Sequence, residues 1–171
     1  CAKFLPRVLH AIFIAGDRRN ELITSNALYL FYNLIIYLIS GQSRYREILK
    51  SVSEKLDVLR NSPSFWPFED ITRDKLELKS TQTLSEFVVF VLETLSWKTT
   101  LVQEWGAEAL DLAMTTDNHH ILARCLQIYR SLKPKISRED LFRILGRLKV
   151  YFLKKEPLGT GLEIVYTLQE A

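Results

Sequence analysis

Apolar residues recur three or four positions apart along nearly the whole chain, and no segment alternates with the period of two that a half-buried strand requires. One such stripe runs through Leu5, Leu9 and Ile12, and another begins with Leu84 and Val88. This spacing places the apolar side chains on one face of an α-helix, and that face is buried against other helices. The sequence therefore predicts an all-α fold.

The expected helix starts follow one another at a steady interval. Starts near residues 83, 100, 118 and 137 are 17 to 19 residues apart. Two such helices make a unit of roughly 34 to 38 residues, close to the roughly 40 residues of HEAT and armadillo repeats. We predict a HEAT/armadillo-like α-solenoid of about eight antiparallel helices, and we favour it over a closed four-helix bundle because of the steady spacing.

We expect one helical-repeat segment over residues 1–171, with the first helices in 1–60, an extended aromatic and proline-containing loop in 61–82, and later helices in 83–171. Asn61-Ser62-Pro63 is expected to stop the preceding helix, because proline lacks a backbone donor. The chain begins at Cys1 and apolar residues run almost to Ala171. We therefore expect it to be a piece of a longer protein.

Several helix starts can be predicted from polar residues. Thr83 with Glu86 and Ser137 with Asp140 have the spacing of a capping box, in which two backbone donors are satisfied reciprocally. Asp117 is expected to cap the helix that follows it.

The charge balance argues against a nucleic-acid partner. The chain has 23 basic and 20 acidic residues, and no basic block gathers on one segment. Cys1 and Cys125 are too few for a disulfide framework or a zinc site, so a reducing, intracellular setting is expected.

The most apolar run extends from Ala27 to Ile39 and contains Asn33. It is about 13 residues long, whereas a membrane-spanning helix needs about 20. We interpret it as a buried helix packed between neighbours, and we do not expect a transmembrane protein.

The sequence offers little for catalysis, so we expect no enzyme, no cofactor and no metal. The histidines are His10, His119 and His120, and two adjacent helical residues cannot chelate a metal jointly. Gly159-Thr160-Gly161 lacks the lysine and the preceding strand of a phosphate loop and is expected to be a turn. Asp70 has no evident partner histidine.

Arg124, Gln127 and Arg130 follow one another at i, i+3 and i+6 on one side of their helix. As a protein-binding site, they could accept an acidic or phosphorylated peptide, because guanidinium binds carboxylate and phosphate bidentately. The alternative is that they pair with Glu104, Glu108 or Asp111 on the preceding helix and fix the packing of the repeat.

Two further sets of residues are candidates for binding a protein. Arg143 and Arg147 lie on a basic edge of a later helix, for which a solvated face is the alternative. Trp66 and Phe68 lie in the expected loop, where aromatic residues either dock a partner or anchor the loop to the helices.

The segment around the expected helix pair resembles a known family. Trp105 to Leu110 reads W-G-A-E-A-L, and Arg124 to Pro134 reads R-C-L-Q-I-Y-R-S-L-K-P. Shorter matches are Leu5-Pro6 with Leu9-His10, Trp66 with Glu69-Asp70-Ile71, and Glu163-Ile164 with Thr167-Leu168. This pattern is similar to that of the Furry (cell morphogenesis) family. His119 and Cys125-Leu126 depart from it, as expected of a divergent member.

The resemblance implies a segment of a very large, non-enzymatic HEAT/armadillo scaffold that works with an NDR-type kinase and its Mob co-activator. It also implies a role in cell polarity, morphogenesis and cytoskeletal organisation, in the cytoplasm at the cell cortex or on the cytoskeleton. The alternative function is a HEAT-type trafficking or transport adaptor that binds linear peptides or lipid head groups. An accessory helical domain of an enzyme is a third possibility.

Overall fold

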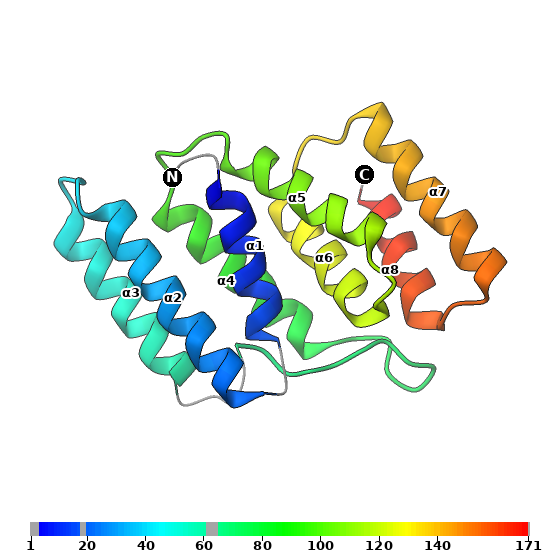
Figure 1. Cartoon of the computed structure of the whole chain (residues 1–171), viewed down its shortest axis with the longest axis horizontal. Coiled ribbons are helices and arrows are strands. Elements are labelled where there is room, and N and C mark those ends of the chain that lie inside the picture. Colours follow the sequence, from blue (N-terminus) through cyan, green and yellow to red (C-terminus); the bar gives the residue numbers. More distant parts are fainter. Residues whose placement is uncertain (1–3, 18–19, 61–64, 171) are drawn as a thin grey trace. The chain divides into compact units, whose positions relative to one another are not determined.

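Figure 1 shows the computed structural model of the chain, which describes residues 4–17, 20–60 and 65–170. Over these ranges the chain forms eight α-helices, and its extended backbone includes one isolated bridge, between Thr72 and Lys75. The all-α prediction is confirmed. Cys1 and Asn61-Ser62-Pro63, on which expectations were based, lie outside the described residues.

The chain divides into two compact units, Cys1–Phe68 and Glu69–Ala171. The first unit contains α1 (Leu5–Gly16), α2 (Glu21–Ile39) and α3 (Tyr45–Arg60), and α2 contacts both of the others. Helix α2 begins at Asn20, whose side-chain oxygen accepts hydrogen bonds from the backbone amides of Leu22 and Ile23. This is the usual way in which the unpaired amides at a helix start are satisfied.

Helix α2 buries one face rather than most of its sides, which differs from the expectation. Its buried residues recur every three or four positions, as in Ala27, Phe31 and Ile35, whereas Tyr29 and Tyr37 on the other side are 69% and 64% exposed. The helix is long and apolar enough to cross a membrane by length and composition alone. One such helix is weak evidence of a membrane span, and α2 packs against α1 and α3.

The aromatic residues after α3 anchor the chain within the first unit. Phe65 and Trp66 are 3% and 2% exposed, and the Trp66 ring lies 5.4 Å from the Phe13 ring of α1. The Phe65 amide donates to the Gly16 carbonyl at 3.2 Å. Loop anchoring, one of the two interpretations of these aromatic residues, therefore accounts for Trp66, while Phe68 is half-buried.

The second unit contains the other five described helices. These are α4 (Lys79–Thr94), α5 (Leu101–Thr115), α6 (His119–Leu132), α7 (Arg138–Lys154) and α8 (Leu158–Gln169). Helices α4, α6 and α8 form one row, in which α6 contacts both of the others, and α5 and α7 form a second row. Between the rows, α5 contacts α6 and α7 contacts α8. Helices that follow one another in sequence thus alternate between two rows, the arrangement that a helical repeat predicts. The solenoid itself remains a prediction.

The predicted capping box at Ser137 and Asp140 is present, and it starts α7. The starts predicted near residues 100 and 118 are also confirmed, by α5 at Leu101 and α6 at His119, but the cap predicted for α6 is wrong. Helix α6 is capped by Asn118, whose side chain accepts from the Ile121 amide at 3.0 Å, and not by Asp117. The segment Gly159-Thr160-Gly161 forms the first turn of α8 rather than a separate turn.

Helix α4 begins at Lys79, four residues before the predicted start at Thr83. The reason is that its cap comes from a distant residue: a Glu69 carboxylate oxygen accepts from the Ser80 amide at 2.8 Å. Thr83 lies inside the helix, where its hydroxyl donates to the Lys79 carbonyl.

Gly106 in α5 lies against Pro134, which follows α6. A Cβ atom at Gly106 would lie 2.9 Å from both Cβ and Cγ of that proline ring, which cannot rotate away. Gly146 in α7 has nothing within 4 Å of the same position. Gly106 and Pro134, which both belong to the family pattern, thus contact each other where α5 meets the residues after α6.

Gly106→Ala should lower the free energy of unfolding by about 1 to 2 kcal/mol, because overpacking exceeds the gain in helix propensity. Gly146→Ala serves as the matched control and should raise it by about 0.5 to 1 kcal/mol, since alanine is the better helix former. Urea denaturation of the two variants measures both changes. Equal stabilisation by both alanines would contradict the close approach to Pro134.

Candidate functional site

Helix α6 is the central helix of the second unit, because α4, α5 and α8 all pack against it. Residues 122–129 of this helix are buried without interruption. They include Arg124 and Gln127, each 1% exposed. Charged side chains are almost never buried unless they are paired, so the partners of these residues decide what they do.

The Arg124 guanidinium joins α6 to α4 and to the loop before it. Its Nη1 atom donates to the Ser80 hydroxyl at 2.9 Å and to Gln127 Oε1 at 2.6 Å. Its Nη2 atom donates to the Glu69 carbonyl at 3.0 Å. One buried side chain thus holds the start of α4 on the middle of α6.

Gln127 and Arg130 join α6 to α8 in the same way. The Gln127 amide donates to Glu163 Oε1 at 2.5 Å, and Arg130 Nη2 lies 2.5 Å from Glu163 Oε2. Arg130 Nη1 donates to the Glu163 carbonyl and to the Thr167 hydroxyl. We call the connected set the buried polar chain; it consists of Ser80, Arg124, Gln127, Arg130, Glu163 and Thr167.

Arg124, Gln127 and Arg130 lie together on one side of α6, as their spacing predicts. The prediction that their packing partners lie on the preceding helix is wrong for Arg130, because the carboxylate that it contacts is Glu163 of α8. Ser80, Glu163 and Thr167 of the buried polar chain were not proposed as site residues from the sequence. Glu163 and Thr167 lie in a segment that carries the family resemblance, which was the one available signal for them.

Glu69 extends the buried polar chain to the loop before α4. Burial raises the pKa of this carboxyl, but hydrogen bonds from Lys75 at 2.5 Å and from the Ser80 amide outweigh it and lower the pKa to about 2, from an ordinary 4.5. A depressed pKa in the folded state stabilises the protein above the unfolded-state value, and this stabilisation is lost as the pH falls toward the folded-state value.

The chain should therefore lose stability between about pH 4.5 and pH 2 in part through Glu69. Glu69→Gln should make the unfolding free energy less dependent on pH over this window, and it should be less stable than the wild type at pH 6. Urea denaturation at several pH values measures this. Parallel curves for the two proteins would show that the folded state does not depress the pKa of Glu69.

The two arginines of the expected basic edge have different environments. Arg143 pairs with Asp111 of α5, and its side chain is 33% exposed. Arg147 is buried and lies 2.8 Å from Glu156, which is also buried. The expectation of a solvated edge is thus wrong for Arg147, which ties α7 to the start of α8. The exposed cations of this region are Lys149, Lys154 and Lys155.

Asp70, His120 and Cys125, which are side chains of types that can carry chemistry, are paired or buried. Asp70 does have a partner histidine, contrary to expectation: His120 Nδ1 lies 2.6 Å from its Oδ1 atom. Burial raises the pKa of the Cys125 thiol to about 12, so the thiolate that reacts is scarce at neutral pH. Within the described ranges, no three histidine, cysteine, aspartate or glutamate side chains are grouped to hold a metal ion.

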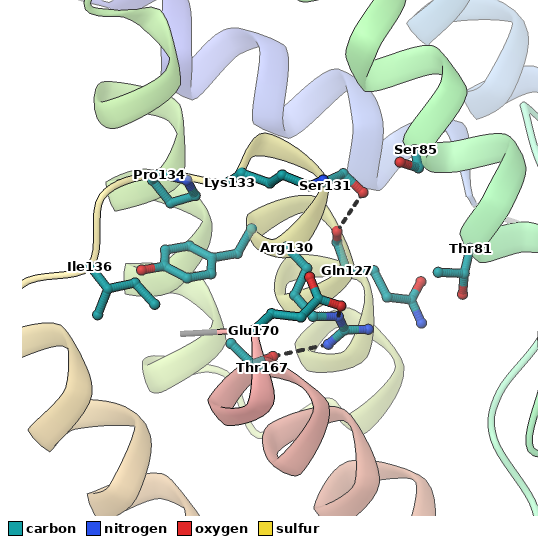
Figure 2. Close-up of a pocket in the computed structure, with 11 residues that line it drawn as sticks. Thr81, Ser85, Gln127, Arg130, Ser131, Lys133, Pro134, Ile136, Thr167 and Glu170 are labelled. Atoms are coloured by element: carbon teal, nitrogen blue, oxygen red, sulfur yellow. Dashed lines mark hydrogen bonds and ion pairs between the residues drawn. The ribbon is translucent and has the colours of Figure 1, made fainter.

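A groove of about 630 Å³ lies beside the Arg130 end of the buried polar chain (Figure 2). Figure 2 shows Thr81 and Ser85 of α4 on one side, Thr167 and Glu170 at the α8 side, and Arg130 between them. The remaining lining comes from α6 and the residues after it: Gln127, Tyr129, Ser131, Lys133, Pro134 and Ile136. The groove thus combines apolar surface with cationic, hydroxyl and carboxylate groups.

Comparisons with known proteins identify the family of the chain. A family model described as the cell morphogenesis central region matches residues 2–158. Cell morphogenesis protein PAG1 of Saccharomyces cerevisiae is 26% identical over 144 residues, which cover 84% of this chain and 6% of that protein. The chain thus spans a small fraction of the length of this relative. No solved structure matches it. Because the family model covers most of the sequence, the chain belongs to the cell morphogenesis central-region family.

Proposed function

We propose that this chain is a segment of a large, non-enzymatic scaffold that supports signalling by an NDR-type kinase and its Mob co-activator. The observation that carries the proposal is the match of the cell morphogenesis central region over residues 2–158. The relative is a cell morphogenesis protein of which the matched stretch is 6%, so this segment would be one small part of a long chain. The kinase and Mob partners are those that the family resemblance implies.

The structure supports a role based on binding. In the second unit, the buried polar chain fixes α4, α6 and α8 to one another through side chains with almost no exposure, such as Arg124 and Glu163. A preorganised surface loses little conformational freedom when a partner docks, so more of the contact energy remains as affinity. The segment would act in the cytoplasm, at the cell cortex or on the cytoskeleton, in cell polarity and morphogenesis.

Of the residues proposed from the sequence, Arg143 and Phe68 keep accessible surface, and they remain candidates for contacting a partner. Arg124, Gln127, Arg147 and Trp66 are buried and Arg130 is largely so; they would act by holding the helices that present the surface. A partner would therefore meet the exposed residues that these side chains support.

Isothermal titration calorimetry of the chain with an NDR-type kinase–Mob complex, at two salt concentrations, tests the proposal. We expect micromolar or tighter binding, and weaker binding at the higher salt concentration if exposed lysines such as Lys149 and Lys154 contribute. Absence of heat from a chain shown to be folded by circular dichroism would exclude this segment as the kinase contact. Binding of anionic lipid vesicles without the complex would instead favour the trafficking adaptor.

A further inference from the structure

The groove beside Arg130 continues into a second hollow. The first, of about 630 Å³, ends at Lys133, Pro134 and Ile136. The second, of about 500 Å³, ends at residues 71–78, in the loop before α4. Thr81, Ser85 and Arg130 line both, so the two hollows meet there and form one elongated depression across α4, α6 and α8. We call this the α4–α8 groove.

The side of the groove formed by α4 carries two hydroxyl groups that are available to a ligand. Thr81 and Ser85 are one helical turn apart, and neither hydroxyl is hydrogen-bonded to another side chain or carbonyl of the described residues. Four residues of α-helix rise about 6 Å. Alternate residues of an extended chain are about 6.6 Å apart and present their backbone groups to the same side. These hydroxyls therefore match the repeat of an extended peptide backbone.

The two ends of the groove differ in chemistry. At one end Lys133 is exposed, and no carboxylate of the described residues lies within ion-pair distance of it. Arg130 is already neutralised, since it lies 2.5 Å from Glu163 and 3.9 Å from Glu170. Lys133 is thus the cation that a ligand carboxylate could neutralise.

The other end is mainly apolar. Ile71, Leu76, Leu78 and Tyr166 line it together with the polar side chains of Glu77 and Gln82, and Leu76 is 53% exposed. A large apolar side chain placed there would remove this exposed surface from water. Among the groove residues that the structure describes, Lys133 is the one cation without an ion-pair partner. This is a poor match to a lipid surface, which attracts clusters of basic residues. An extended peptide supplies side chains for both ends of the groove and backbone groups for the two hydroxyls between them.

We infer that the α4–α8 groove binds an extended segment of a partner polypeptide, with a large apolar side chain at the Leu76 end and a carboxylate side chain at Lys133. The inference rests on the proposed function, in that the segment works by binding proteins, and it adds the chemistry of one partner. Of the groove residues, Gln127 and Arg130 alone were proposed from the sequence as a protein-binding site.

Selection of a phage-displayed library of random 12-residue peptides on the 171-residue chain tests the inference. We expect enriched sequences to share an acidic residue and a large apolar residue at a fixed separation. Fluorescence anisotropy with a labelled peptide of the enriched sequence then measures affinity. Lys133→Glu should weaken binding about tenfold or more, the loss of one charge-assisted contact. A peptide with lysine in place of its acidic residue should regain affinity for this variant.

Lys155→Glu is the matched control. Lys155 also ends a helix in a left-handed conformation, with φ 53° against 50° for Lys133, and it is exposed outside the groove. This variant should bind the peptide like the wild type. Ser85→Phe, which fills the groove, should abolish binding while circular dichroism shows an unchanged helical fold. If Ser85→Phe alters the fold, the comparison of Lys133→Glu with Lys155→Glu decides alone.

The inference is overturned if no sequence is enriched, if the enriched peptide binds Lys133→Glu as well as wild type, or if Lys155→Glu loses as much affinity. It is also overturned if phosphatidylserine vesicles, and no peptide, bind in a Lys133-dependent manner. Titration of the kinase–Mob complex into the same proteins separates the two proposals. If the complex binds but no peptide is enriched, the proposed scaffold function stands and the peptide-binding groove is rejected. If a peptide is enriched but the complex does not bind, the groove stands and the kinase–Mob partner is rejected.

Discussion

Replacing Glu163 with alanine should lower the free energy of unfolding by about 3 to 5 kcal/mol, because it removes the carboxylate to which the buried Arg130 guanidinium and the buried Gln127 amide both donate. The Glu163 side chain is 2% exposed and that of Arg130 is 9% exposed, so water cannot replace the lost contacts. Gln127 loses the acceptor of its amide at the same time. Urea denaturation followed by circular dichroism measures the change.

Glu170→Ala is the control for this prediction. Its carboxylate also lies near Arg130, at 3.9 Å, but its side chain is 55% exposed, and such pairs contribute about 0 to 1 kcal/mol. Similar losses for Glu163→Ala and Glu170→Ala would contradict the account, because they would show that the Glu163 contact is no more than a surface ion pair.

Trp105→Ala should be as damaging, with a loss of about 3 to 5 kcal/mol, because it leaves a large cavity in the core of the second unit. Trp105 lies in α5 and is 0% exposed. The ring is therefore fully enclosed within the second unit, in the segment that carries the family pattern. The same denaturation experiment measures the change.

Trp97→Ala provides the comparison, since Trp97 is 41% exposed and its replacement should change stability by about 0.5 kcal/mol or less. A loss below about 1 kcal/mol for Trp105→Ala would place that ring at the surface. It would contradict the packing of α5 against α6.

Helix starts show what local sequence can and cannot predict. The start of α7 was predictable because Ser137 and Asp140 cap it from within four residues. The start of α4 was not, because the group that satisfies its Ser80 amide is Glu69, eleven residues earlier and outside the helix. Periodicity predicts where a helix lies, but a cap supplied by the tertiary fold leaves no local pattern.

The same limit applies to the candidate site, in which the shared helix face was predictable and the partners were not. Helical spacing predicted that Arg124, Gln127 and Arg130 share a face, since this depends on helix geometry alone. Their partners are 33 to 55 residues away in sequence, as in the contact of Arg124 with the Glu69 carbonyl. Such pairs depend on which helices pack together, which the spacing of one helix does not contain. The contact of His120 with Asp70, fifty residues apart, was missed for this reason.

Hydrogen exchange of the chain alone and with a saturating NDR-type kinase–Mob complex tests the central claim most directly, namely that a rigid helical segment presents a binding surface. In the free chain, amides of α6 should exchange slowest, because this helix is buried among α4, α5 and α8. With the complex, exchange should slow in a confined set of exposed segments. Unchanged exchange throughout the chain at saturation would contradict the proposed scaffold function of this segment.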